Sequence, residues 1–140
     1  MLPIVVQASL SDADSDALYA GLLATDPSDR PRAYAGLALT VHDGARLVAG
    51  LTGATVWTWL SIDVLWVSPE LRGQGYGRRL LTEAESIARS RGCQHARLDT
   101  FDFQARAFYE QLGYRVYAEL QDFPEGHRQL HLVKHLAPAS

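Results

Sequence analysis

Cysteine is nearly absent from this chain of 140 residues, because Cys93 is the only one. A single thiol excludes an internal disulfide and any zinc site built from four cysteines. Long apolar runs are missing too, and no stretch approaches the roughly 20 residues that a membrane-spanning helix needs. Residues 1–10 have no basic segment ahead of an apolar one. We therefore expect no secretory signal, no membrane partner and a cytoplasmic protein.

Positive charge is not in excess either, since the formal net charge is −3. Proteins whose main partner is nucleic acid usually present a basic face, so we expect no nucleic-acid partner. Apolar residues make up 47% of the chain and charged residues 21%, which are ordinary globular values. A chain of this length predicts one domain over residues 1–140, with a frayed tail at 137–140.

The order of the apolar patterns predicts a mixed α/β (α+β) fold. Ser11 followed by acidic residues indicates a helix start, and Asp43-Gly44 indicates a two-residue hairpin turn. Farther on, apolar residues recur at helical spacing between Leu80 and Ala88. We expect strands at 2–8, 35–41, 96–101, 114–120 and around 130–136, a hairpin at 46–67 with its turn near 57–59, and helices after Ser11, around 80–88 and at 104–112.

A glycine-rich segment, Arg72-Gly73-Gln74-Gly75-Tyr76-Gly77, precedes the expected helix at 80–88. Glycine lets the backbone turn tightly and lets a ligand approach main-chain amides closely. Amides at the start of a helix point the same way and, with the helix dipole, form an anion site. Arg72, Arg78 and Arg79 add three cations, which suits a diphosphate. The alternative is a plain glycine turn that caps the helix.

Glycine spacing separates the families of phosphate-binding proteins. A phosphate-loop NTPase needs a lysine after its last glycine, but Arg78 follows Gly77 here. The dinucleotide pattern Gly-x-Gly-x-x-Gly fails by one residue. The pattern Arg/Gln-x-x-Gly-x-Gly/Ala is satisfied by Arg72, Gly75 and Gly77. In this the chain resembles the GNAT-superfamily N-acetyltransferases, whose pyrophosphate-binding signature has this form.

Two further stretches carry the same resemblance. Residues 64–72 look like the strand and linker before the glycine turn of that family, and residues 107–114 look like its late motif. Residues 98–105 and 122–127 are similar to a group of small bacterial GNAT proteins of mostly unassigned substrate. The resemblance implies a single GNAT-like domain whose mixed, mostly antiparallel sheet is flanked by helices. It also implies acetyl transfer from acetyl-CoA, as co-substrate, to a primary amine.

The resemblance extends to the site that would hold acetyl-CoA. The backbone of residues 65–67 would pair with the pantetheine arm as an added strand, and the glycine-rich turn would hold the pyrophosphate. Many relatives carry an asparagine seven residues before the late-motif tyrosine, where this chain has Asp102. Either another group, such as Gln104, makes that contact, or the affinity for the donor is altered. The expected cofactor-binding residues are Leu65, Trp66, Val67, Arg72, Gly73, Gln74, Gly75, Tyr76, Gly77, Arg78 and Gln104.

Tyr109, in the late motif, is the candidate general acid. A phenol has an ordinary pKa of about 10, so it is protonated at neutral pH and can donate toward a departing thiolate. The matching tyrosine has that role in many members of the family. The alternative is that Tyr109 only packs in the core beside Phe108.

Asp63, on the strand that leads to the turn, is the candidate base, because the family often has an acidic residue there. A carboxylate needs burial or a water relay to take a proton from an ammonium. The alternative is a carboxylate that faces solvent or pairs with an arginine. His127 and His131 are further candidates, because imidazole titrates nearer to neutral pH.

Metal is not expected, because histidines four residues apart in a strand lie roughly 13 Å apart. A small-molecule amine is the expected acceptor, since the chain is short and has no appended recognition module. The resemblance also makes a homodimer an expectation. Two other functions stay open: a coenzyme A sensor without turnover, and nucleic-acid binding through the arginine cluster, which would show as salt-dependent retention.

Overall fold

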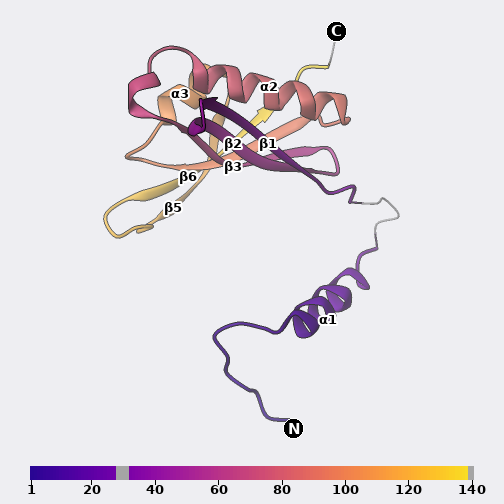
Figure 1. Ribbon diagram of the computed structural model, residues 1–140. Coiled ribbons are helices and arrows are strands. Elements are labelled where there is room, and N and C mark those ends of the chain that lie inside the picture. Colours follow the sequence, from indigo (N-terminus) through magenta and orange to yellow (C-terminus); the bar gives the residue numbers. More distant parts are fainter. Residues whose placement is uncertain (28–31, 139–140) are drawn as a thin grey trace. The chain divides into compact units, whose positions relative to one another are not determined.

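The computed structural model describes residues 1–27 and 32–138. The chain divides into two compact units, Met1–Pro31 and Arg32–Ser140 (Figure 1). Within the described ranges, no helix is both long and apolar enough to cross a bilayer. The tail predicted at 137–140 lies partly outside these ranges. In its described part, the Ala137 carbonyl accepts a hydrogen bond of 2.6 Å from Arg89 Nε.

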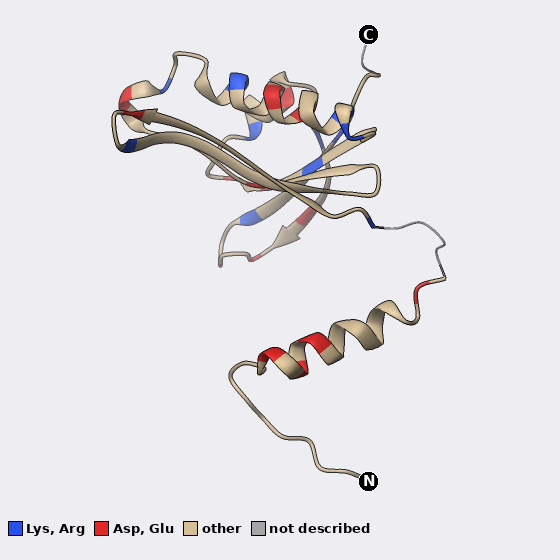
Figure 2. Ribbon diagram, turned by 45° about the vertical axis from the view of Figure 1, so that its right-hand side comes forward, with Lys and Arg blue, Asp and Glu red and all other residues tan. Residues whose placement is uncertain are grey.

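In the described part of the first unit, residues 12–23 form helix α1 (Asp12–Leu23), which confirms the helix predicted after Ser11. The Ser11 hydroxyl accepts a hydrogen bond of 3.1 Å from the Asp14 amide, and acidic residues occupy the first turn (Figure 2). The strand predicted at 2–8 is wrong, because these residues form neither strand nor helix. β-Branched residues favour an extended chain, but a strand also needs a hydrogen-bonding partner, and the side chains of Ile4, Val5 and Val6 are exposed.

The second unit is a six-stranded sheet with the order β1-β2-β3-β4-β6-β5. All pairs are antiparallel except β3 with β4, so the predicted mixed, mostly antiparallel α/β architecture is confirmed. The elements are β1 (Ala35–Asp43), β2 (Arg46–Val56), β3 (Trp59–Val67), a short 3-10 turn (Pro69–Leu71), α2 (Tyr76–Ser90), β4 (His95–Phe101), α3 (Arg106–Gln111), β5 (Arg115–Gln121) and β6 (Arg128–His135).

Helix α2 covers one face of the sheet, over β1, β2 and β3 (Figure 1). Its apolar stripe is buried, and Leu81, Ala84 and Ala88 are fully enclosed. They pack in one cluster with strand residues such as Leu51 and Leu60. This stripe at helical spacing is what fixes the helix on the sheet, because burying it removes apolar surface from water.

Strands β3 and β4 pair over only three positions, which end at Ser61 opposite Arg97. Beyond that pair both strands continue without a shared ladder, to Val67 and Phe101. A register shift in the β2–β3 ladder leaves Asp63 without a partner on β2, which makes a bulge in β3. The strands therefore part, and the sheet opens at their carboxyl ends.

Candidate active site

Two cavities adjoin each other at this opening. The first, the strand cleft, has a volume of about 710 Å³ and lies between β3 and β4. The second, the turn pocket, has a volume of about 450 Å³ and lies beside the glycine-rich turn. The strand cleft is lined by residues 62–67, Arg72, 98–101, Phe103, Gln104, Ala105, Tyr109 and Gln129. The turn pocket is lined by Leu65, Val67, residues 71–73, residues 75–78, Ala105, Phe108 and Tyr109.

The turn pocket contains the start of α2, where Gly75 is the N-cap residue with a φ of 88°. This left-handed conformation favours glycine. No side chain caps the helix, and its first turn has no acidic residue. The first-turn amides have no acceptors within the helix, and the residues that carry them line the pocket at the positive end of the helix dipole. This arrangement is suited to an anion.

Gly77 allows α2 to approach α3 closely. A Cβ atom there would lie 3.2 Å from Phe108 Cζ, which is tighter than ordinary contact. Arg72 Nε donates a hydrogen bond of 3.1 Å to the Val67 carbonyl, and this bond holds the guanidinium where the two cavities meet. Arg78 also lines the turn pocket. Arg79, by contrast, lies over the Tyr76 ring and lines a separate cavity, so two of the three expected arginines face the pocket.

The expected cofactor-binding residues divide between the two cavities. Trp66 and Gln104 line only the strand cleft. Gln74 lines neither cavity, because its amide donates a hydrogen bond of 3.2 Å to the Glu70 carbonyl and ties the side chain back to the loop. The remaining eight, which line the turn pocket, are Leu65, Val67, Arg72, Gly73, Gly75, Tyr76, Gly77 and Arg78.

Tyr109 lines both cavities. Tyr109 is 8% exposed. Its backbone is held in place because its carbonyl accepts a hydrogen bond of 3.0 Å from the Tyr114 amide. The ring packs edge-on against Phe108, with 5.1 Å between the ring centroids. Burial raises the pKa of the Tyr109 phenol above its ordinary value. The phenol therefore stays protonated at neutral pH, as a proton donor must.

Two carboxylates line the strand cleft, one from each of its walls. Asp63 lies at the bulge of β3, and its side chain is exposed. Asp99 lies on β4, where His131 Nδ1 is 3.6 Å from its Oδ1 and Gln129 Nε2 donates a hydrogen bond of 3.4 Å to its Oδ2. Sequence reasoning gave Asp99 no role, because nothing local indicates that β4 lies beside β3. His131 approaches the cleft only through Asp99.

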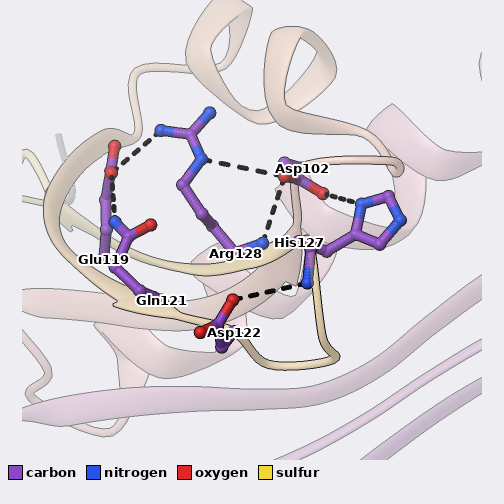
Figure 3. Close-up of polar contacts among 7 residues, drawn as sticks. Asp102, Glu119, Gln121, Asp122, His127 and Arg128 are labelled. Carbon is purple, nitrogen blue, oxygen red and sulfur yellow. Dashed lines mark hydrogen bonds and ion pairs between the residues drawn. The ribbon is translucent and has the colours of Figure 1, made fainter.

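Asp102 lines neither cavity, and its carboxylate instead binds the hairpin between β5 and β6 (Figure 3). Its Oδ1 lies 3.0 Å from His127 Nδ1, and its Oδ2 accepts a hydrogen bond of 3.1 Å from the Arg128 amide. Burial alone would raise the pKa of Asp102, but these hydrogen bonds and the nearby positive charges outweigh it and lower the pKa. His127 is thus occupied by Asp102 and is absent from the lining of the cleft.

Gln104 lies where a bound arm between the strands would pass. Its side-chain oxygen accepts hydrogen bonds of 3.2 Å from the Thr100 hydroxyl and 3.3 Å from the Phe101 amide. These two bonds orient the side chain and leave its amide nitrogen as a donor. Across residues 1–27 and 32–138, no group of three or more histidine, cysteine or acidic side chains is placed to hold a metal ion.

Comparison with known proteins identifies the family of this chain. The model of the acetyltransferase (GNAT) family matches residues 8–114. The chain belongs to the GNAT acetyltransferase family. The sequence resemblance to these enzymes is therefore confirmed, and so is the predicted GNAT-like fold.

Relatives of this GNAT protein are named as acetyltransferases. Blasticidin-S acetyltransferase from Streptomyces morookaense is 45% identical over 91 residues, which cover 64% of this chain and 67% of the relative. The crystal structure of an acetyltransferase from Bacillus cereus ATCC 14579 is 31% identical, with a TM-score of 0.80, and the match covers 94% of this chain and 98% of that one.

A more distant structure was solved with a ligand. The crystal structure of an aminoglycoside 6'-N-acetyltransferase complexed with coenzyme A is 18% identical, with a TM-score of 0.66, and the match covers 93% of this chain and 83% of that one. At this identity the likeness shows a shared fold.

Proposed function

We propose that the protein transfers the acetyl group of acetyl-CoA directly to the primary amine of a small molecule. The observation that carries this proposal is that Tyr109, a buried and protonated phenol, forms a wall common to the turn pocket and the strand cleft. A donor that extends from the turn pocket into the strand cleft and an acceptor held in that cleft would meet at its hydroxyl. Positioning two reactants in this way removes much of the entropic cost of their encounter.

The residues of the turn pocket fit the pyrophosphate of coenzyme A. The first-turn amides of α2 would donate hydrogen bonds to it, and the guanidinium groups of Arg72 and Arg78 would supply the opposite charge. Residues 65–67 of β3 extend along the opening and have no ladder to β4. Apart from the Val67 carbonyl, which accepts a hydrogen bond from Arg72, their backbone groups on that edge could bind the pantetheine arm. Gln104 would provide one further donor.

The reaction needs two proton transfers, and each has a candidate residue. The amine nitrogen forms a bond to the thioester carbonyl carbon, and the bond from that carbon to sulfur breaks. Tyr109 donates its hydroxyl proton to the departing thiolate, and Asp63 takes the proton that the nitrogen loses, directly or through a water molecule. Exchange with solvent then restores both groups. A main-chain amide of residues 65–67 would stabilise the negative charge on the carbonyl oxygen.

The acceptor is proposed to be a small molecule because the strand cleft has the size of a small-ligand site. Such sites usually measure about 300–1,000 Å³, and the cleft, at about 710 Å³, lies within that range. By its name, the relative from Streptomyces morookaense acetylates blasticidin S. That supports a small acceptor here without identifying it.

The test is acetylation of a panel of small amines, with release of the coenzyme A thiol as the readout. We expect the Tyr109→Phe variant to lose about 100-fold in kcat, since general acid catalysis contributes roughly 10²- to 10⁴-fold. It should bind acetyl-CoA with unchanged affinity in calorimetry, because the hydroxyl is used only in the reaction. Tyr34→Phe is the matched control, because this tyrosine is 72% exposed and lines neither cavity.

Two results would overturn the proposal. An unchanged kcat in Tyr109→Phe would remove the acid role, and tight binding of coenzyme A without acetylation of any amine would favour the sensor function. The homodimer and the cytoplasmic location stay predictions. Sedimentation of the purified chain tests the first, and cell fractionation tests the second.

A further inference from the structure

Asp63 on β3 and Asp99 on β4 both line the strand cleft, one from each of its two walls. The last parallel pair is Ser61 with Arg97, and each aspartate lies two residues beyond it on its own strand. Both side chains line the cavity. Two negative charges that line one cavity repel each other, and a cation bound between them would be attracted to both. The two carboxylates therefore favour a positively charged occupant in the cleft.

The positive side chains near the cleft make other contacts. Of the described residues that line it, Arg72 is the one with a positive charge, and it is bonded to the Val67 carbonyl at the end shared with the turn pocket. Arg97 lies before the opening, does not line the cleft, and donates a hydrogen bond of 2.8 Å to the Ser61 hydroxyl. His131 Nδ1 lies 3.6 Å from Asp99 Oδ1. Of these three groups, His131 is the one that contacts either carboxylate.

Aromatic rings complete the lining around the acidic part of the cleft. Phe101 and Phe103 stack with 5.3 Å between their centroids, and both line the cavity. The Phe103 residue is 56% exposed, so its ring is accessible to a ligand. The face of an aromatic ring carries partial negative charge, so it attracts organic cations and repels a carboxylate. The rings and the two aspartates thus select for the same chemical class of occupant.

We propose that the amine acceptor carries a second positive charge and that Asp99 binds it, an inference that rests on the acetyl transfer proposed above. Asp63 takes the proton of the amine that reacts. The carboxylate on the opposite strand, Asp99, is therefore the one left to bind the second positive charge. Asp99 is suited to this role because its carboxylate is accessible, while Gln129 Nε2 donates a hydrogen bond of 3.4 Å to its Oδ2 and helps to position it. A charge-assisted hydrogen bond to an ammonium or guanidinium group is among the stronger polar contacts. Asp99 is thus a specificity-determining residue.

The test uses four primary amines built on a four-carbon chain, which differ in the group at the far end. They are 1,4-diaminobutane, agmatine, n-butylamine and 4-aminobutanoate, which end in an ammonium, a guanidinium, a methyl and a carboxylate group. We expect the two dications to exceed n-butylamine by about tenfold or more in kcat/KM, which corresponds to about 1.4 kcal/mol. The aminobutanoate should react most slowly, because the two aspartates repel its carboxylate.

The Asp99→Asn variant should lose about tenfold in kcat/KM for the dications and stay within about twofold for n-butylamine. Its affinity for acetyl-CoA should not change, because Asp99 does not line the turn pocket. Glu83→Gln is the matched control, since it removes one negative charge from an exposed position on α2 outside the cleft. In the wild-type protein, raising the ionic strength from about 0.01 M to about 1 M should reduce kcat/KM for the dications more than for n-butylamine.

The outcomes separate the two proposals. Acetylation of n-butylamine as fast as the dications, or equal losses for all amines in Asp99→Asn, would overturn the second-cation inference and leave acetyl transfer standing. If no amine is acetylated by a protein that binds acetyl-CoA, the proposed function fails, and the inference fails with it. Should Asp99→Asn not fold, the salt dependence of the wild-type protein decides the question.

Discussion

The Asp102 carboxylate lies 3.0 Å from the His127 ring and joins the loop after β4 to the hairpin between β5 and β6 (Figure 3). The same carboxylate accepts a hydrogen bond from the Arg128 amide, while the Asp102 amide donates one of 3.0 Å to the Arg128 carbonyl. Arg128 in turn binds Glu119 on β5, at 2.9 Å. The residue that departs from the family pattern therefore anchors a hairpin.

Replacing Asp102 with asparagine should loosen this hairpin and should not improve the binding of coenzyme A. Because the pKa of Asp102 is lowered in the folded protein, its stabilising contribution is present above the ordinary aspartate pKa of about 3.9 and is lost as the pH falls through the folded value. Hydrogen exchange of residues 122–127 should be faster in Asp102→Asn at neutral pH, and in the wild type only below about pH 4. Asp43→Asn, at the end of β1, controls for the loss of charge.

The pH dependence of turnover should reflect the buried phenol. Burial raises the pKa of Tyr109, so the proton donor persists beyond the ordinary tyrosine pKa of about 10. With saturating acetyl-CoA and amine, kcat should show no fall on the alkaline side up to about pH 10, while the fraction of neutral amine increases. A decline centred well below pH 10 that disappears in Tyr109→Phe would contradict the assignment, because it would mean that the phenol ionises early.

A buried polar cluster beneath α2 should account for a measurable part of the stability. The Tyr114 hydroxyl donates a hydrogen bond of 2.7 Å to Glu85, and Lys134 Nζ donates one of 2.8 Å to the other oxygen of the same carboxylate. Both Tyr114 and Glu85 are buried. Tyr114→Phe leaves the carboxylate short of one partner, so the free energy of unfolding in urea should fall by about 1–3 kcal/mol. Tyr34→Phe should change it by less than about 0.5 kcal/mol.

The contacts of Tyr114 with Glu85 should also make the stability of the protein depend on pH in the alkaline range. Burial, followed by the negative charge of Glu85, raises the pKa of Tyr114 well above its ordinary value. The stabilisation is therefore complete below the unfolded tyrosine pKa of about 10 and declines as the pH rises above it. Tyr114→Phe should be less sensitive than the wild type in that range. Equal sensitivity would mean that Tyr114 exchanges its proton freely in the folded state.

Local patterns predicted most of the second unit. The stripe from Leu80 to Ala88 and the Asp43-Gly44 turn depend on neighbours within a few residues. Helix α2 formed over the predicted stripe, and the first hairpin formed with its turn at residues 44–45, one residue later than predicted. The strand predicted at residues 2–8 did not form, because a strand depends on a partner that is distant in the sequence. Their β-branched side chains favour an extended chain, but pairing with a partner strand is a tertiary property that no short window contains.

The same contrast between local and long-range information applies to the candidate site. The glycine spacing located the turn pocket, because positive φ angles and helix starts are encoded locally. The orientation of Gln74 and the position of Asp99 opposite Asp63 were not accessible, because they depend on loop packing and on the order of strands far apart in the sequence. Nor did any local pattern mark the bulge at Asp63, since it arises from the register of β3 against β2.

Gly53 lies on β2 beside this bulge, where the register shifts. A substitution at Gly53 therefore tests whether the bulge determines the opening of the sheet. A Cβ atom on Gly53 would collide with the Ser61 carbonyl oxygen on the neighbouring strand, so Gly53→Ala must shift β3 or its register. We expect a loss of about 1–3 kcal/mol in the free energy of unfolding, the usual cost of overpacking. We also expect weaker coenzyme A binding in calorimetry, because β3 lines both cavities. Gly36→Ala is the matched control, since a Cβ on this β1 residue meets nothing within 4 Å. If both variants bind and unfold alike, the bulge does not determine the shape of the opening.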